Sequence, residues 1–556
     1  MSGNASNGGD DSTIEINGRG LTPADVVAVA RNDAPVRVTA AGREAVRQSR
    51  ERVEDILAAD EVVYGVNTGF GELVNERITP DNIEALQTNL LRSHAAGVGR
   101  ELTREEVRAM LVARVNALVM GYSGVREVVI DHLVALLNEG VHPVVPSRGS
   151  LGASGDLAPL AHASLVLIGE GNADVDGERL DGEAALERAG LDPLSLAAKE
   201  GVALINGTQL TAGLGALAVY DARRTIQAAD MAGALTIEAT LSSTIPSHPT
   251  ISNVRPHGGQ EASARTIRTL TADSDVVESH RNCDRVQDAY SLRCLPQVHG
   301  AVRDAVEHLH EAITTELNSA TDNPLVFERE AVPDRASGAG SGAVLSGGNF
   351  HGEPLALRLD YGTNALTELA AISERRIDRM LNPNVQEPHL EPFLTDYGGL
   401  MSGYMIAQYT AAALLNECRA SGAHSTDNTP VSGNQEDHVS MSAGAALTFR
   451  DVLADVQTVV AIELLCAAQS VEFVKRHLAE QSSDDTASED GDSPSLGRGT
   501  SVVFETIREV VPQLDVDREP HVDIERVRTL VRSGLLVGRV ADHVDIDSSG
   551  RTPVPE

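Results

Sequence analysis

Lysine is almost absent from this sequence. Of its 45 basic residues only Lys199 and Lys475 are lysines, while 81 acidic residues give a formal net charge of −36. This charge argues against nucleic acids and anionic membrane surfaces as partners. An acidic surface nearly free of lysine predicts a protein that works at high salt, where screening relieves its self-repulsion. The alternative is an arginine-biased genome with an incidental acidic surface.

Cysteine is also scarce, and export signals are missing. No CxxC pair and no disulfide-like spacing occurs among Cys283, Cys294, Cys418 and Cys466. The first residues lack the basic and apolar regions of a signal peptide. Both observations predict a cytoplasmic protein in a reducing compartment.

One uncharged stretch, residues 201–220, is long enough to suggest a membrane span. Its polar residues Asn206, Thr208, Gln209 and Thr211 would be poorly tolerated against lipid, and four glycines weaken the case further. We therefore expect a buried helix here.

Helical patterns dominate the rest of the chain. Residues 104–140 place apolar side chains three and four apart and break near Gly121 and Gly124, and residues 298–320 and 449–480 show the same period. Their apolar surfaces are too broad for lone surface helices, which predicts packing in a bundle and between subunits. Strand-like segments are few and short, so the expected class is mainly α.

Composition divides the chain into five expected segments. The first residues and the stretch Glu480–Gly499 are rich in small polar and acidic residues, which is typical of disorder or loops. The expected segments are a disordered acidic tail (1–14), an N-terminal domain (15–205), a central helical bundle domain (206–479), an acidic flexible loop (480–499) and a C-terminal helical segment (500–556).

The stretch GSLGASGDLAPL (149–160) places three glycines ahead of a helical run. A phosphate loop would need a G-K-[ST] ending, and Asp156 would repel the anion. A nucleophile elbow would need G-x-S-x-G, but Gly155 and Asp156 follow Ser154 directly. A plain turn into a helix at Leu157 is the simplest interpretation.

The same stretch also permits a chemical modification. In a tight bend the Gly155 nitrogen can attack the Ala153 carbonyl carbon and close a five-membered ring, because its small neighbours leave room. Loss of water from the ring and from the Ser154 side chain leaves a 4-methylidene-imidazol-5-one (MIO). This group is an electrophile, which the twenty side chains otherwise lack.

Eight blocks of the sequence resemble, in order, the histidine/phenylalanine ammonia-lyase family, whose signature reads G-S-L-x-A-S-G-D-L-x-P-L. They cover roughly residues 55–450. The blocks are YGVNTGFG (64–71), LLRSHAAGVG (90–99), GSLGASGDLAPL (149–160), LINGTQ (204–209), RVQDAYSLRCLPQVHG (285–300), TDNPLVF (321–327), SGGNFHGEP (346–354) and GNQEDHVSM (433–441).

The resemblance implies a mainly α fold, with a long central helix bundle of the fumarase/aspartase-like type. A smaller mixed N-terminal domain would carry the cofactor loop. It implies that Ala153, Ser154 and Gly155 form MIO, with no exogenous cofactor, in a homotetramer with shared active sites. No metal site is expected, because the close histidine pairs lack an H-E-x-x-H pattern or cysteine partners.

Four residues receive roles in ring and proton chemistry from the resemblance. Asp156 would assist ring formation, and Asn206 would lie beside the ring and hold its oxygen or the substrate amine. Tyr64 is the candidate base for the β-proton, although a free phenol titrates near pH ~10 and needs stabilisation to act at neutral pH. Tyr290 would orient the substrate or transfer a proton.

Four further residues would contact the substrate by the same resemblance. Arg293 suits a carboxylate, which guanidinium binds through two parallel hydrogen bonds. Gln287 and Asn323 are expected to line the pocket, and Phe350 would pack over the ring and the substrate.

Two polar residues favour an imidazole substrate. His94 follows Ser93, and Glu436 lies in the NQEDH stretch, where relatives acting on phenylalanine carry other residues. A carboxylate and an imidazole can bind both nitrogens of a histidine side chain, while a phenyl ring would leave them unpaired at about 1–3 kcal/mol each. The implied reaction converts L-histidine to trans-urocanate and ammonia.

Three alternatives remain at this point. A tyrosine or phenylalanine ammonia-lyase or aminomutase would share the blocks but not His94 and Glu436. A non-catalytic assembly of the same fold would never form the ring. A lyase of the fumarase/aspartase type would need a G-S-S-x-M-P-x-K-x-N loop, which the sequence lacks.

Overall fold

The computed structural model describes residues 13–59, 63, 82–281, 285–426, 428–484 and 494–546. The chain forms two compact units. Unit 1 comprises Met1–Tyr220, Leu309–Asp360 and Ala423–Leu447, and unit 2 comprises Asp221–His308, Tyr361–Gly422 and Thr448–Glu556. Because each unit combines segments distant in sequence, the division into five consecutive segments stays a prediction.

Helices are the main secondary structure of both units, and the mainly α class is confirmed. Unit 1 contains α1 (Pro23–Asn32), α2 (Ala40–Ala58), α3 (Ile83–His94), α4 (Arg104–Val119), α5 (Glu127–Asn138), α6 (Leu157–Leu167), α7 (Gly182–Arg188) and α8 (Glu200–Ile205). Unit 2 contains α10 (Pro249–Asn253), α11 (Gly258–Leu270), α12 (Asp275–Ser279), α13 (Tyr290–Arg293), α16 (Met405–Ala420), α18 (Arg498–Val510), α19 (Pro520–Ser533) and α20 (Leu535–Ala541).

Four long helices contribute residues to both units: α9 (Gln209–Ala239), α14 (Leu295–Leu317), α15 (Glu353–Leu381) and α17 (Ser442–Asp484). Short 3-10 turns complete the helical elements at Ile245–Ser247, Arg329–Ala331, Pro392–Leu394 and Ser432–Asn434.

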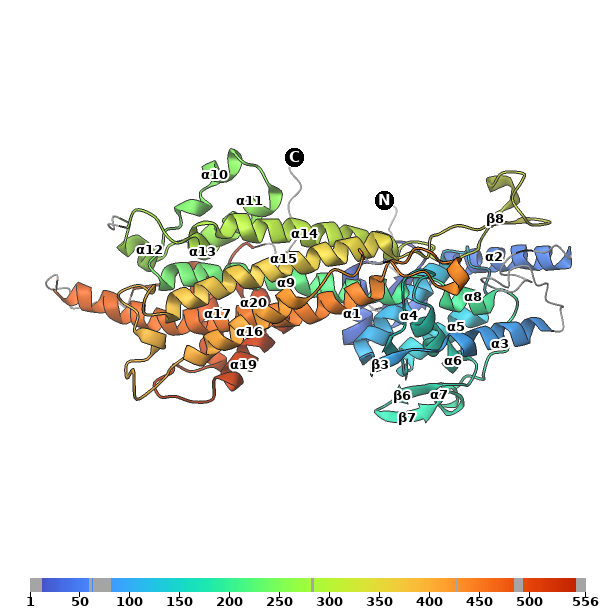
Figure 1. Cartoon of the computed structure of the whole chain (residues 1–556), viewed down its shortest axis with the longest axis horizontal. Coiled ribbons are helices and arrows are strands. Elements are labelled where there is room, and N and C mark those ends of the chain that lie inside the picture. Colours follow the sequence, from blue (N-terminus) through green and yellow to red (C-terminus); the bar gives the residue numbers. More distant parts are fainter. Residues whose placement is uncertain are drawn as a thin grey trace, which may run out of the picture. The chain divides into compact units, whose positions relative to one another are not determined.

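The strands of the described chain are short and belong to unit 1. They are β1 (Ile14–Ile16), β2 (Val36–Val38), β3 (Val98–Glu101), β4 (Val141–Pro143), β5 (Pro146–Arg148), β6 (Asn172–Val175), β7 (Glu178–Asp181), β8 (Leu325–Glu328) and β9 (Gly342–Leu345). Only β1 and β2 pair in parallel, while β3–β5, β4–β6–β7 and β8–β9 are antiparallel. Figure 1 shows the β6–β7 hairpin beside α7.

Local sequence explains where the helices begin and end. Thr103 and Glu106 form a reciprocal capping box at the start of α4. Gly121 adopts φ +78° beyond its end, and a Cβ there would lie 2.6 Å from the Ala45 carbonyl oxygen, so only glycine fits. The predicted break near Gly121 and Gly124 is therefore confirmed.

The uncharged stretch 201–220 forms two buried helices rather than the single helix expected. Helix α8 ends at Ile205 and α9 begins at Gln209, so Asn206, Gly207 and Thr208 form a turn between them. Gly207 adopts φ +141°, which a continuous helix does not allow. Among the described residues, no helix combines the length and apolar composition that a membrane crossing requires.

The acidic stretch 480–499 is also more helical than expected at its ends. Helix α17 continues to Asp484, and α18 begins at Arg498. Residues 485–493 lie outside the described part, as do residues 1–12 of the expected disordered tail.

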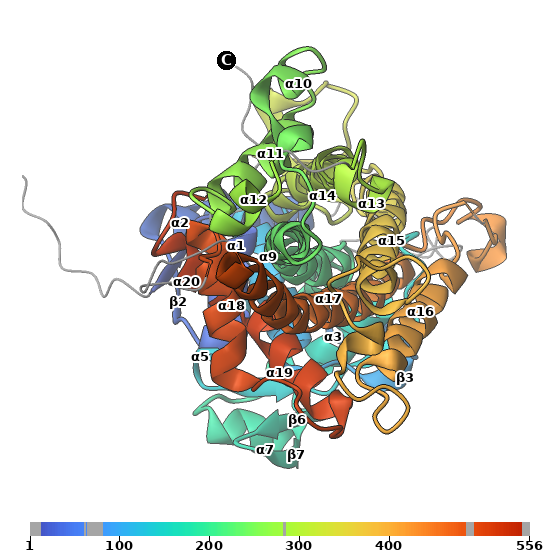
Figure 2. The same ribbon diagram turned by 90° about the vertical axis from the view of Figure 1, so that its left-hand side faces the viewer.

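Unit 2 is a helix bundle in which α9, α14, α15 and α17 lie side by side (Figure 2). Besides apolar packing, a buried polar network joins them. The Arg376 guanidinium binds both oxygens of Glu463, with Nε–Oε1 at 2.5 Å, and both side chains are fully buried. Thr236 on α9 and Ser373 on α15 also donate to Glu463, so donors from two helices satisfy this carboxylate of α17.

We expect Glu463→Gln to destabilise the protein by about 3–5 kcal/mol, because Arg376 would keep a buried charge without its counterion. Asp396→Asn is the matched control, since Asp396 pairs with Arg476 on the surface, where both are more than 40% exposed. That loss should stay below about 1 kcal/mol. Thermal unfolding measures both, and equal losses would contradict the role given to the buried pair.

Candidate active site

The glycine-rich stretch forms a tight loop between β5 and α6 in unit 1. Gly152 and Gly155 adopt φ +69° and +75°. A Cβ on Gly155 would lie 2.2 Å from the Gly207 carbonyl oxygen, and one on Gly152 would lie 2.1 Å from Ser440 Oγ. The predicted turn into a helix at Leu157 is confirmed, but it is pressed against other chain segments rather than free.

The turn between α8 and α9 holds this loop at three points. Asn206 Nδ2 donates to the Ser154 carbonyl oxygen at 2.7 Å, and the Asp156 N–H donates to the Gly207 carbonyl oxygen at 2.6 Å. Gly155 and Gly207 form a parallel bridge between these contacts. Asn206 Oδ1 is buried and has no hydrogen-bond partner among the described residues, so it is available to a ligand.

Asp156 is completely buried at the N-terminus of α9. Its carboxylate accepts from the Thr211 N–H at 2.9 Å, from the Thr211 hydroxyl at 3.2 Å and from Ser150 Oγ at 2.8 Å. Burial raises the pKa of this carboxyl, and the hydrogen bonds from Thr211 and Ser150 oppose the rise. Free N–H groups at a helix N-terminus also favour an anion at this position.

Two distant segments close the other side of the loop. The Gly152 carbonyl oxygen accepts from the Gly352 N–H and from Ser440 Oγ, each at 3.1 Å. The Met441 N–H donates to the Leu151 carbonyl oxygen at 2.7 Å. The SGGNFHGEP and GNQEDHVSM blocks are therefore brought to the loop by backbone hydrogen bonds.

A cavity of about 950 Å³ opens in unit 1 in front of the loop. Seven of the predicted site residues line it: His94, Ala153, Ser154, Asn206, Asn323, Phe350 and Glu436. Gly155 and Asp156 lie buried behind its wall. Residues from six separate blocks of the sequence therefore meet around one space.

His94 and Glu436 contribute polar groups to the lining of the cavity. His94 Nδ1 lies 2.9 Å from the Leu90 carbonyl oxygen, which only accepts, so Nδ1 carries the proton and Nε2 is the nitrogen left for a ligand. His351 and His438 also line the cavity and stack with ring centroids 5.7 Å apart. The sequence prediction did not include these two histidines, although both lie in quoted blocks.

The Asn323 amide is engaged with the protein. Its Oδ1 accepts from the Gly347 N–H at 2.7 Å, and its Nδ2 donates to Ser346 Oγ at 3.1 Å. It therefore fixes the loop that leads to Phe350, in addition to lining the cavity.

Gln287, Tyr290 and Arg293 lie together in unit 2, beside a second cavity of about 530 Å³ that Gln287 and Arg293 line. The Arg293 guanidinium donates to Gln287 Oε1 and lies over the Tyr290 ring, 4.6 Å from its centroid. Tyr290 is 71% exposed. These three residues contact one another but do not line the unit 1 cavity, so their expected roles at the substrate stay predictions.

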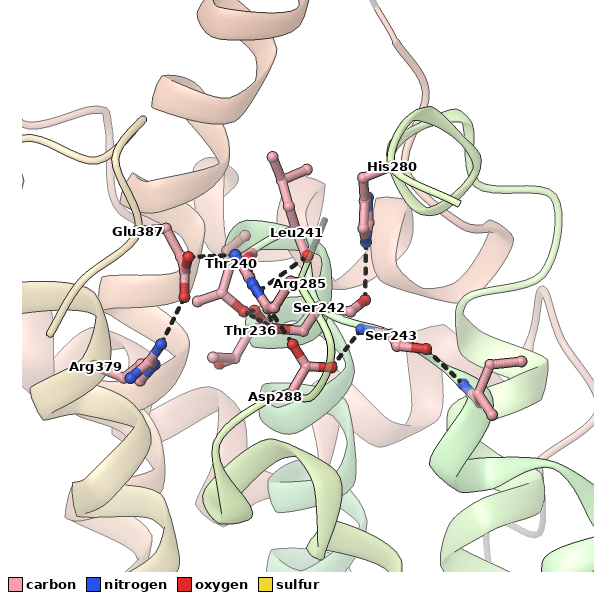
Figure 3. Close-up of polar contacts among 12 residues, drawn as sticks. Thr236, Thr240, Leu241, Ser242, Ser243, His280, Arg285, Asp288, Arg379 and Glu387 are labelled. Carbon is pink, nitrogen blue, oxygen red and sulfur yellow. Dashed lines mark hydrogen bonds and ion pairs between the residues drawn. The ribbon is translucent and has the colours of Figure 1, made fainter. Parts of the chain in front are cut away.

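Arg285 fixes the segment that carries this cluster (Figure 3). Its guanidinium donates to the Thr240 and Leu241 carbonyl oxygens, beyond the C-terminus of α9, at 3.2 and 3.3 Å. It also binds the carboxylates of Asp288 and Glu387. Composition gives no signal for this role, because arginine is abundant throughout the chain.

Tyr64 lies outside the described residues, so its predicted role as base stays a prediction. Sequence reasoning also missed four residues that support the loop or the turn beside it, one of them, Ser150, within the signature itself. Ser150 and Thr211 donate hydrogen bonds to Asp156, and Ser440 donates one to the Gly152 carbonyl oxygen. The Thr208 hydroxyl donates a hydrogen bond to Glu316. Their types are too common to stand out, and only folding brings them to the loop.

Comparisons with known proteins agree with this geometry. The family described as aromatic amino acid lyase matches residues 21–508. A probable histidine ammonia-lyase of Halobacterium salinarum is 60% identical over 532 residues, covering 96% of this chain and 98% of that protein. A histidine ammonia-lyase of Gloeobacter violaceus is 50% identical over 529 residues, covering 95% and 97%.

Solved structures show the same fold. The tyrosine aminomutase of Streptomyces globisporus superposes with a TM-score of 0.86 at 37% identity, covering 96% of this chain and 99% of that one. The histidine ammonia-lyase of Trypanosoma cruzi superposes with a TM-score of 0.84 at 38% identity, covering 96% of each chain.

Glu316 on α14 gives unit 1 a pH-dependent stability. Burial raises the pKa of this half-buried carboxyl to about 7; the hydrogen bond from Thr208 opposes the rise and nearby Asp156 adds to it. An unfolded glutamate loses its proton near 4.5, so between these values the folded state holds one proton more. Stability therefore falls as pH rises through this window.

Glu316→Gln should remove this dependence, since the amide oxygen still accepts from Thr208 but does not titrate. Between about pH 5 and about pH 8 the free energy of unfolding should fall by on the order of 1–3 kcal/mol more in the wild type than in the variant. Melting curves across this range measure the difference, and parallel curves for the two proteins would refute it.

Proposed function

This chain belongs to the aromatic amino acid lyase family, and from that premise we propose that it removes ammonia from L-histidine to give trans-urocanate. One observation carries the proposal. Ser154, Asn206, His94 and Glu436 line the same unit 1 cavity, and the buried Asn206 Oδ1 has no partner among the described residues. A reactive centre for the amine and polar groups for an imidazole therefore share one space.

We further propose that Ala153, Ser154 and Gly155 form MIO as the only cofactor. The residues fit the group, since the loop is bent at Gly155 and any side chain there would collide with Gly207. When formed, MIO supplies an electrophile that takes the substrate amine and makes it a better leaving group.

The chain's own residues then bind and orient the substrate. Asn206 Nδ2 holds the Ser154 carbonyl oxygen, which leaves Asn206 Oδ1 to accept from the substrate ammonium. The Asp156 carboxylate lies next to Gly155 in the chain and serves as a proton acceptor during maturation. Phe350 covers the substrate from the cavity wall.

His94 and Glu436 give the cavity its preference for histidine. The carboxylate of Glu436 only accepts hydrogen bonds, and His94 Nε2 accepts in the neutral ring because Nδ1 is committed to Leu90. An imidazole can satisfy both residues, whereas the ring of phenylalanine or tyrosine would leave them desolvated and unpaired.

The remaining predicted groups complete the site in a homotetramer with shared active sites. Tyr290 and Val286 are 71% and 93% exposed beside Arg293, which supports coverage of this face by another subunit. Arg293 would hold the substrate carboxylate, Gln287 would line the pocket, and Tyr64 and Tyr290 would handle protons. The acidic, lysine-poor composition and the Halobacterium relative support a cytoplasmic enzyme that works at high salt.

The test of the proposed function compares three amino acids. Purified protein in molar potassium chloride is mixed with L-histidine, L-tyrosine or L-phenylalanine, and near-ultraviolet absorbance and ammonia are followed. The proposal expects urocanate and ammonia in equal amounts from histidine. Turnover of tyrosine in preference to histidine would instead assign the chain to the activity named for the structural neighbour.

Ser154→Ala should leave the chain at its full encoded mass and remove nearly all turnover, because the methylidene carbon comes from the serine side chain. Ser341→Ala, in an exposed loop of the same unit, is the control and should mature and turn over normally. Intact mass and the urocanate assay measure both. Substantial turnover by Ser154→Ala would overturn the cofactor assignment.

Glu436→Gln should lower kcat/KM for histidine by about 10- to 100-fold, corresponding to about 1–3 kcal/mol of lost pairing with the imidazole. Its mature mass should lie two waters below its own encoded mass, as in the wild type, since no hydrogen bond of the described residues joins Glu436 to the ring-forming residues. Kinetics identical to the wild type would refute the recognition role.

A further inference from the structure

The Asn206–Thr208 segment is the surface on which the ring-forming tripeptide rests. Asn206 Nδ2 donates to the Ser154 carbonyl oxygen, and the Asp156 N–H donates to the Gly207 carbonyl oxygen. Gly155 and Gly207 also form a parallel bridge. A segment with this task must itself be fixed. Two ionisable side chains outside every block quoted for the family resemblance hold it from its two ends.

Arg114, on α4, fixes the first end. Its guanidinium is fully buried. Nη2 donates to the Asn206 carbonyl oxygen at 2.9 Å and to the Ala203 carbonyl oxygen, and Nη1 donates to Gln209 Oε1 at 2.6 Å. One rigid group therefore ties the end of α8, the turn and the start of α9 together. Gln209 passes the restraint on to Thr321 Oγ1 at 2.7 Å.

Glu316, on α14, fixes the second end. Its Oε1 accepts a hydrogen bond from the Thr208 hydroxyl. The Thr208 carbonyl oxygen in turn accepts from the Ala212 N–H at the start of α9. Glu316 therefore restrains Thr208, the residue after Gly207, and the Gly207 backbone makes the closest approach to the loop. Arg114 and Glu316 thus act on either side of Gly207.

We propose that Arg114 and Glu316 are positioning residues that set the rate of ring closure at Ala153–Gly155; this inference rests on the MIO cofactor of the proposed function. In closure the Gly155 nitrogen forms a bond to the Ala153 carbonyl carbon, whose oxygen becomes a hydroxyl with the proton from that nitrogen. This hydroxyl leaves as water with the Ser154 N–H proton, and the Ser154 hydroxyl leaves as water with the Ser154 α-proton. No oxidant or other reactant is required.

The physical reason is the bent geometry that closure needs. An amide nitrogen reaches the carbonyl carbon two residues earlier only in a narrow set of conformations, and an unsupported loop visits them rarely. The Asn206–Thr208 segment keeps the loop in that set. A shift of about 1 Å in this support would therefore slow closure without preventing the chain from folding.

The chain offers a matched pair of arginines to test this role. Arg108 lies on the same helix as Arg114, is also buried, and donates to the Val29 and Leu137 carbonyl oxygens at 2.9 and 2.7 Å. Neither acceptor belongs to the loop or its support. Lysine keeps the charge at both positions but lacks the planar fork that serves three acceptors.

The experiment follows intact mass after cell-free synthesis of the full chain in molar potassium chloride. The fraction that is two waters lighter gives the closure rate directly, without an activity assay. Arg114→Lys should close about tenfold or more slowly than the wild type, whereas Arg108→Lys should lose comparable thermal stability and close at the wild-type rate. Equal rates for Arg114→Lys and wild type, or equal slowing in both variants, would overturn the role of Arg114.

A second set keeps the test decisive if Arg114→Lys does not fold. Glu316→Gln still accepts from Thr208 and should close at the wild-type rate, while Glu316→Leu and Thr208→Val should both close more slowly by a similar factor. Closure at the wild-type rate in Glu316→Leu would overturn the role of Glu316. A wild-type chain that never loses water would instead overturn the cofactor proposal, and with it this inference.

Discussion

The site depends on the close approach of two glycines, Gly155 and Gly207. No side chain fits between these backbones, because a Cβ on Gly155 would lie 2.2 Å from the Gly207 oxygen. Their contact joins the bent loop to the turn that separates α8 from α9. The interruption of the uncharged stretch 201–220 therefore holds the loop in place: a continuous helix would have no free backbone oxygen for the Asp156 N–H and no Asn206 amide beside Ser154.

Charges are placed according to how much water surrounds them. The chain carries a large acidic excess. Its buried ionisable groups Arg114, Arg376 and Asp156, by contrast, each have specific hydrogen-bond partners. Even the rare lysines fit this division, since Lys199 is fully buried against Asp322 at 3.3 Å and Lys475 lies 4.2 Å from the Phe504 ring centroid. Lysine is thus retained where a defined partner holds it, and the acid-rich exterior is left to salt screening.

The sequence was sufficient for the helical class, for the break near Gly121, for the turn into a helix at Leu157 and for seven of the residues that line the unit 1 cavity, because glycine placement and block order carry those signals. It did not reveal that residues 201–220 form two helices, since the uncharged composition of this stretch continues across Asn206–Thr208. Nor did it reveal Arg114, Arg285 or Glu316. Their roles come from tertiary contacts between residues as far apart as Thr208 and Glu316, which no local pattern encodes.

The most direct test of the account is the mass of the peptide that spans Gly149–Leu160, released by proteolysis from the mature wild-type protein. The account predicts a peptide lighter than its encoded mass by two waters, with the loss located by fragmentation at Ala153-Ser154-Gly155. An unmodified peptide from protein that turns over histidine would contradict it, because the bent loop and its supports would then have no chemical purpose.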